Sequence, residues 1–354
     1  MQPNAMIPSA DALPVGWGWF QVLLTTTWVL HIVLMNMMLG GTIITLVNSI
    51  RGGETRLGIA RYTSRLIPFA VALAVNAGVA PLLFLQVIYG NFVYVSSVLM
   101  AVYWLSVILM LIFAYYGVYI FRFKFDSWGP ARNIVLGFSA VLLLLIGFLF
   151  TNNWTLALTP EKWVAYFDNP RGTILNLSEP TLWPRYLHMV LGALAVGGLS
   201  LAAFGSKKAT SDPNRAPLMA QGLSWFKWAT LIQVGVGSWW LMALKPEAMK
   251  LFMGGNMMAT GAFGVGFVLA LLALFLGFKG KVWPTVWTTL LTMVTMAIMR
   301  EYVRYGYLRE YFTPPQLEVN TQYSSLILFL VILAIGIGCV WYMLKLAANA
   351  GKEV

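Results

Sequence analysis

Charged residues are scarce in this 354-residue chain: Asp, Glu, Lys and Arg make up 10% of it, and hydrophobic residues make up 59%. Soluble domains carry about 25% charged residues, so this composition excludes an ordinary soluble domain. Backbone groups in lipid must be hydrogen-bonded within their own segment. The sequence therefore predicts an all-α integral membrane protein.

Cysteine is almost absent as well, since the chain contains Cys339 alone. One cysteine excludes an intramolecular disulfide, and it excludes c-type haem attachment, iron–sulfur clusters and cysteine-rich zinc sites within this chain. A small apolar filler is the ordinary role of such a residue.

Apolar runs of about 20 residues predict transmembrane helices. The stretch before Trp17 has no Lys or Arg and no signal-peptidase-like site, so we expect the first run to remain in the protein. Residues 1–354 then form a single membrane domain of about nine spans. The predicted spans are 17–48, 67–89, 93–121, 133–151, 183–205, 222–244, 257–278, 283–307 and 324–346.

The basic residues are unevenly divided between the two faces that nine alternating spans would define. One face carries 15 basic and 4 acidic residues, and the other carries 8 of each. The positive-inside rule makes the basic face cytoplasmic, so we expect the N-terminus outside and the C-terminus in the cytoplasm of a multi-pass protein of the bacterial inner membrane. We do not expect nucleic-acid binding, because no basic patch alternates with aromatic residues on a soluble surface. The charged residues of the basic face are Arg51, Glu54, Arg56, Arg61, Arg65, Arg122, Lys124, Asp126, Arg132, Lys207, Lys208, Asp212, Arg215, Lys227, Lys279, Lys281, Lys345, Lys352 and Glu353.

Histidine occurs twice, at His31 and His188, and both positions fall within predicted spans. An ionisable side chain inside the membrane is costly and indicates a functional site. A neutral imidazole is a common axial ligand of b-type haem. The alternative is a histidine that only hydrogen-bonds to a neighbouring helix.

Methionines open the seventh predicted span at a depth comparable to that of His188, which lies roughly 8 Å below the outer end of the fifth. They are Met253, Met257 and Met258. A His/Met pair would give a six-coordinate haem suited to electron transfer. The alternative for any one of the 18 methionines is flexible apolar filling.

Glu301 and Arg304 lie near the outer end of the eighth predicted span and share a helix face. They predict either an interfacial ion pair or a carboxylate near a haem iron, with the arginine holding a haem propionate.

Aromatic residues mark the longest outer segment, 152–182, and the residue after it. We expect Trp154, Trp163, Tyr166 and Trp183 to form an interfacial belt. The alternative is a docking surface for an extracytoplasmic partner.

Five short motifs occur in a characteristic order along the chain. Together they resemble subunit I of the cytochrome bd quinol oxidases. They are 24–31 (LTTTWVLH) followed by Gly40, 76–80 (NAGVA) followed by Gln86 and 89–90 (YG), 153–154 (NW), 185–188 (RYLH) and Glu301-x-x-Arg304.

The resemblance implies a ligand set for one to three haems b, with quinone as a further ligand. His31 would ligate an active-site haem. His188 would ligate a low-spin haem b, with Met258, or next Met257, on the other side of the iron. Glu301 would ligate a second high-spin haem, with Arg304 beside it.

The chain departs from that family at the residues of the proton route and of the oxygen-reducing site. Two glutamates of the family's third helix correspond here to Ser97 and Leu105, and the third predicted span contains no carboxylate. The long quinol-binding loop is replaced by residues 245–256, and Asn256 stands in place of an arginine. Oxygen reduction consumes protons, which reach a buried site through titratable groups or water. These departures favour electron transfer over oxygen reduction.

We therefore predict a haem b-binding membrane subunit that passes electrons between quinone and an extracytoplasmic redox partner, a c-type cytochrome first among the candidates. One alternative is a terminal quinol:oxygen oxidoreductase of the bd type. Another is a haem-free transporter or membrane anchor, although the sequence shows neither the paired repeats nor the interrupted spans typical of transporters.

Overall fold

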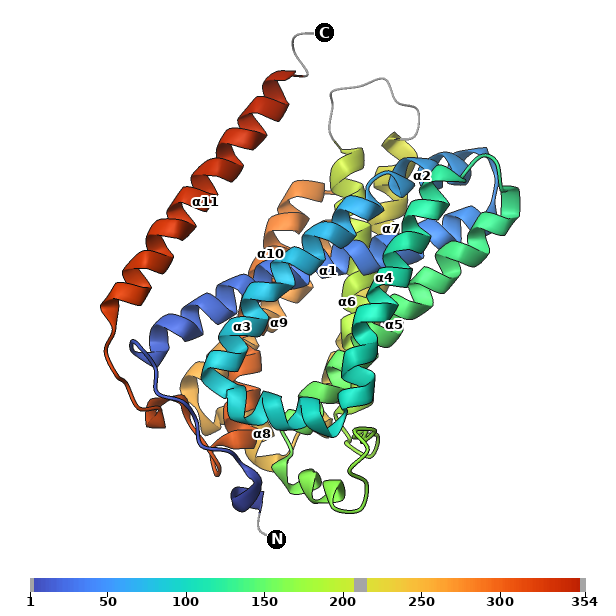
Figure 1. The fold of residues 1–354 in the computed structure, drawn as a ribbon. Helices are drawn as coiled ribbons and strands as arrows, with labels where there is room; N and C mark the ends of the chain where they lie inside the picture. The colour runs from blue at the N-terminus through green and yellow to red at the C-terminus, as the bar shows by residue number, and fades with distance from the viewer. Residues whose placement is uncertain (1–2, 207–214, 351–354) are drawn as a thin grey trace.

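The computed structural model describes residues 3–206 and 215–350. Within these ranges the regular structure is helical, and one isolated parallel β-bridge joins Leu13 to Val319. Figure 1 shows long helices that run between two ends of a bundle. The short helix α2 (Glu54–Ser64) marks the α2 end, and the short helix α8 (Pro246–Lys250) and the first described residues, in η1, mark the α8 end.

Nine long helices of the described residues cover the nine predicted spans, although the third predicted span, 93–121, begins inside the helix that contains the second. Eight of the described helices are long and apolar enough to cross a membrane. The remaining one, α7, is less apolar because it carries Lys227, Gln233 and several tryptophans. A crossing by α7, and with it the count of nine spans, stays a prediction. The long helices are α1 (Trp17–Arg51), α3 (Ile67–Leu99), α4 (Ala101–Phe123), α5 (Arg132–Ala157), α6 (Leu182–Gly205), α7 (Arg215–Ala243), α9 (Met257–Phe278), α10 (Val282–Leu308) and α11 (Tyr323–Ala350).

Short helical turns connect the long helices or precede them: η1 (Pro3–Met6), η2 (Gly129–Ala131), η3 (Pro160–Tyr166), η4 (Leu251–Gly255) and η5 (Pro314–Gln316). The charged residues of the expected basic face that the structure describes lie toward the α2 end, in α2, in the helix ends there and in the α4–α5 and α9–α10 connections. Five others, Lys207, Lys208, Asp212, Lys352 and Glu353, lie outside the described residues.

The break expected between the second and third spans is wrong. Helix α3 continues past Tyr89, where it only kinks (φ −123°, ψ 25°), and the chain turns at Met100. Residues just after the kink, such as Phe92 and Val93, are buried, so packing keeps this segment helical. As a result Ser97 lies on α3 and Leu105 on α4, and the expectation that both lie on one helix is also wrong.

Close backbone contacts hold α1, α6 and α7 together. A Cβ atom added at Gly40 of α1 would lie 1.9 Å from the Ala193 carbonyl oxygen of α6, and one added at Gly222 of α7 would lie 2.5 Å from the Gly198 oxygen of α6. Small residues at such crossings let membrane helices approach closely. By contrast, α11 stands apart from the bundle (Figure 1), and its ring contact to the bundle joins Phe329 to Phe84 at 6.2 Å.

We predict that Gly40→Ala destabilises the protein, because the added methyl group would force α1 and α6 apart. Overpacking of this kind costs roughly 1–3 kcal/mol, and it should lower the apparent thermal midpoint measured in detergent at a fixed heating rate. Gly41→Ala is the matched control, since a Cβ there has no neighbour within 4 Å. Equal midpoints for the two variants would contradict a tight α1–α6 crossing.

Candidate functional site

His31 lies between α1 and α3. Its Nδ1 atom is 3.0 Å from the carbonyl oxygen of Ala74, and a Cβ added at Gly78 would lie 2.8 Å from its Cε1 atom. A carbonyl oxygen can only accept, so Nδ1 carries the proton and Nε2 keeps its lone pair. This is how second-shell contacts prepare a metal-binding imidazole, and it is also the helix-to-helix hydrogen bond expected as the alternative.

His188 lies between α6 and α7, about 9 Å along α6 from its start at the α8 end. The Gln233 amide nitrogen is 3.2 Å from the Nε2 atom of His188 and donates to the His188 carbonyl oxygen at 3.3 Å. The Trp240 ring lies 5.4 Å from the imidazole. Among the described residues, Nδ1 of His188 and Nε1 of Trp240 are buried and find no hydrogen-bond partner.

Two arginines of α10 stack on aromatic rings from other helices. Arg304, only 1% exposed, forms an ion pair with Glu301, and its guanidinium carbon lies 4.3 Å from the Tyr89 ring and 4.6 Å from the Trp154 ring. Arg300 lies 3.6 Å from the other Glu301 oxygen and 5.6 Å from the same Trp154 ring. Cation–π contacts of this kind hold guanidinium groups where few carboxylates are near.

A third arginine, Arg185 of α6, completes this group. It lies over the Trp240 ring at 5.3 Å, and its charge interacts with those of Arg300 and Arg304. Among the described residues, the Nε atoms of all three arginines and Nη2 of Arg304 are buried without a hydrogen-bond partner. Arg185 forms no ion pair among the described residues, and the two α10 arginines share the one carboxylate of Glu301. Buried cations with too few partners are costly, so this arginine group is suited to an anionic ligand.

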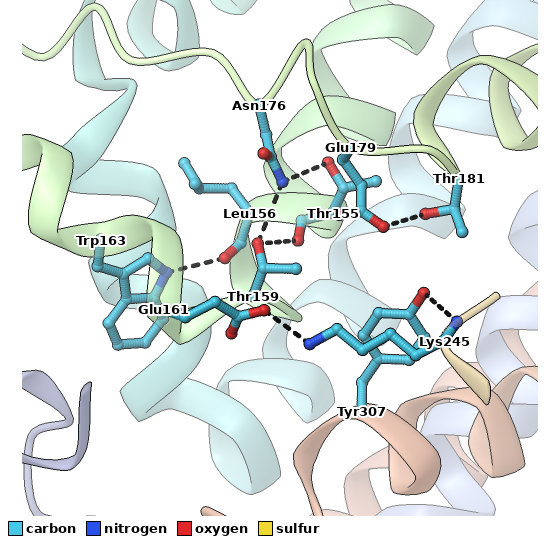
Figure 2. Close-up of polar contacts among 10 residues, drawn as sticks. All are labelled: Thr155, Leu156, Thr159, Glu161, Trp163, Asn176, Glu179, Thr181, Lys245 and Tyr307. Carbon is cyan, nitrogen blue, oxygen red and sulfur yellow. Dashed lines mark hydrogen bonds and ion pairs between the residues drawn. The ribbon is translucent and has the colours of Figure 1, made fainter. Parts of the chain in front are cut away.

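The outer segment 152–182 folds over the α8 end through its own polar contacts (Figure 2). The indole nitrogen of Trp163 donates to the Leu156 carbonyl oxygen at 2.8 Å, and the Asn176 amide donates to Thr159 at 3.1 Å and to Thr155 at 3.4 Å. Glu179 accepts from the Thr181 hydroxyl at 2.9 Å. The segment is therefore a packed cap over the bundle.

The expectation that the aromatic residues of this segment form an interfacial belt or a docking surface is wrong for Trp163, which is 1% exposed and belongs to the core. Trp154 lies against the arginine group. Only Tyr166 and Trp183 are exposed. The sequence could not separate these cases, because buried and interfacial tryptophans both need a partner for the indole N–H.

Lys245, in the link between α7 and α8, ties the cap to α10. Its Nζ atom lies 2.6 Å from Glu161 of η3, and its backbone N–H donates to the Tyr307 hydroxyl at 3.3 Å (Figure 2). Burial lowers the pKa of Lys245, but the hydrogen bond and the charge of Glu161 outweigh burial and raise that pKa above its ordinary value. The ammonium group is therefore held in its charged form beside Tyr307.

The candidate methionine ligands at the start of α9 do not lie in the core. Met257 and Met258 are 85% and 68% exposed at the start of α9, where the Asn256 side chain accepts from the Ala259 N–H at 3.0 Å and caps the helix. The pairing of His188 with Met258 stays a prediction.

The structure unites some of the predicted site residues and separates others. It joins Glu301 to Arg304 and leaves His31 and His188 at different helix interfaces. It also adds Arg185 and Arg300, which sequence reasoning did not select. Arg185 lies three residues before His188 and Arg300 four residues before Arg304, so helical spacing from the chosen residues was the available indication.

Comparison with known proteins finds one kind of similarity. No protein-family model matches the chain, and no curated protein matches it. Among solved structures, the chain is similar to a chain of the bd oxidase from Geobacillus thermodenitrificans, with a TM-score of 0.69 and 12% sequence identity over 96% of this chain and 97% of that one. The two chains thus share one fold from end to end, and at this identity the likeness establishes the fold alone.

Proposed function

We propose that this chain is a haem b-binding membrane subunit of a respiratory complex, which passes electrons between quinone and a redox partner at the α8 end. The observation that carries the proposal is the set of buried guanidinium N–H groups on Arg185, Arg300 and Arg304 that find no hydrogen-bond partner among the described residues. Arg185 lies one helical turn before His188 on α6. The bd-oxidase fold supports the same reading.

The residues present fit haem b in two respects. The cofactor needs axial ligands for its iron, and its two propionates need cationic donors. His31 would offer Nε2, because Ala74 holds the proton on Nδ1. The arginine group would hold the propionates. When bound, the haem supplies reversible one-electron chemistry.

His188 needs one adjustment to serve as a ligand. In the structure the Gln233 amide nitrogen faces Nε2 of His188, but an amide group carries both a donor and an acceptor. With the amide oxygen toward Nε2, the imidazole would donate from Nε2 and present the lone pair of Nδ1. Met258 or Met257 stays the candidate second ligand, although both side chains are exposed at the start of α9, and Glu301 is the candidate ligand of a further haem.

Electron transfer is favoured over oxygen reduction because α3 and α4 contain no carboxylate. A terminal oxidase must bring protons to its oxygen site. The hydroxyl groups of Ser96 and Ser97 lie 3.4 and 3.5 Å from the Asn153 amide group, and neither supplies the charge of the missing carboxylates. The oxidase remains the second candidate on the strength of the fold.

The basic α2 end is assigned to the cytoplasm by the positive-inside rule, so the arginine group lies toward the outer side of a bacterial inner membrane. That position suits an extracytoplasmic electron partner, for which a c-type cytochrome is our first candidate. Quinone would approach from the bilayer.

We predict that the purified protein binds haem b and that His31→Ala and His188→Ala each remove haem. A pyridine haemochrome assay per mole of protein reports cofactor type and stoichiometry. Thr27→Ala and Ser200→Ala are matched controls on α1 and α6, because these hydroxyls bond only to carbonyls of their own helices. Wild-type protein without Soret absorption would rule out the proposal and favour a transporter or anchor.

Glu301→Gln should destabilise the haem-free protein more than the haem-loaded one. Removing one partner of a buried ion pair costs about 3–5 kcal/mol, and bound propionates would replace the lost negative charge beside Arg304. Thermal midpoints of both forms test this, with exposed Arg309→Gln as the control. An equal loss in both forms would mean that no anionic group binds the arginine group.

We expect the purified complex to consume oxygen with quinol no faster than a protein-free blank, because α3 and α4 offer no carboxylate route for protons. An oxygen electrode gives the measurement, and reduction of the chain's haem by quinol in the same sample is the positive control. Rapid oxygen uptake, whether or not cyanide inhibits it, would instead establish the oxidase alternative.

A further inference from the structure

A second concentration of positive charge lies at the α2 end, far from the arginine group. We call it the basic cluster, and it consists of Arg61 and Arg65 at the end of α2 and of Arg122 and Lys124 at the end of α4. Arg61 pairs with Asp126. Among the described residues, Arg65, Arg122 and Lys124 form no ion pair, so the cluster has excess positive charge.

The cluster is built around exposed phenylalanine rings. The guanidinium carbon of Arg122 lies 5.9 Å from the Phe69 ring and 5.7 Å from the Phe123 ring. These rings are 62% and 71% exposed. Arg65 and Leu66 have helical backbone angles ahead of α3, so Arg65 lies one helical turn before Phe69 on the same side.

The connection between α4 and α5 is held firmly beside the cluster. Arg132, which is buried, donates to the Phe125 carbonyl oxygen and, at 3.2 Å, to the Ser49 hydroxyl. Its guanidinium carbon lies 4.1 Å from the Phe125 ring. The Arg61–Asp126 pair joins the same connection to α2. The connection after α4 and the Arg61 side chain are therefore held in place before any ligand binds.

Exposed apolar side chains continue from the cluster toward the middle of the membrane. Leu73 lies one turn beyond Phe69 on α3, and Ile120 and Tyr116 precede Phe123 on α4. Their exposed fractions are 56%, 38% and 66%. Cations above exposed apolar side chains match a molecule with an anionic head and hydrocarbon tails.

We infer that the basic cluster is a binding site for an anionic phospholipid, whose phosphate lies between Arg65, Arg122 and Lys124 and whose acyl chains cover the exposed apolar side chains of α3 and α4. Basic pockets at the cytoplasmic ends of membrane helices bind acidic lipid headgroups, and each basic residue near the surface contributes about 1 kcal/mol, or roughly a fivefold change in affinity. The inference does not depend on haem binding.

Native mass spectrometry of the full chain in neutral detergent tests this inference. The protein is titrated with phosphatidylglycerol or with phosphatidylcholine of the same acyl chains, and the Kd of the first bound lipid is compared. We expect tighter binding of phosphatidylglycerol. Arg65→Gln/Arg122→Gln should weaken that binding about 25-fold, from a fivefold loss at each site.

Three further variants keep the test decisive. Arg171→Gln/Arg309→Gln, at exposed positions toward the α8 end, should bind as the wild type does. Arg65→Lys/Arg122→Lys should retain most of the affinity, and Lys124→Gln alone should lose about fivefold if the double variant fails to fold. Equal Kd values for the two lipids, unchanged binding in the glutamine variants, or displacement of the lipid by millimolar inorganic phosphate would each overturn the assignment.

Discussion

The burial of three guanidinium groups in an apolar bundle is the constraint on which the rest of this structure depends. Arg304 is almost entirely enclosed and has Glu301 as its partner. The rings of Trp154 and Tyr89 supply the other contacts. Those rings come from α5 and α3, so the positions of both helices relative to α10 are tied to the arginines. The cap, held by Trp163 and by the Glu161–Lys245 pair, then closes the bundle beside them.

The helical fold could be predicted almost entirely from the sequence, because long apolar runs and alternating charge are global properties of a membrane chain. Nine long helices of the described residues cover the predicted spans, and the likeness to a bd-oxidase chain supports the helical fold. The continuation of α3 past Tyr89 could not be predicted from the sequence. A Tyr-Gly-Asn sequence is typical of a turn, and only tertiary packing of Phe92 and Val93 shows that it continues as a helix.

The site was less accessible to sequence reasoning. The two histidines, Glu301 and Arg304 stand out because polar groups are rare in the spans, and the structure pairs the last two. Gln233 and Trp240 were not selected because neither side chain is ionisable, and their importance comes from facing His188 across a helix interface. Such a contact depends on the rotation of α7 about its axis, which composition does not determine.

The kink at Tyr89 has a consequence for the fit of the protein to its bilayer. A straight helix of 33 residues would rise about 50 Å, whereas the hydrocarbon core is about 30 Å thick. After the kink, the last part of α3 runs crosswise along the α8 end (Figure 1), so its length does not add to the height of the bundle. The chain thereby avoids hydrophobic mismatch. The last part of α3 covers the α8 end of the bundle with apolar residues that would otherwise protrude into water.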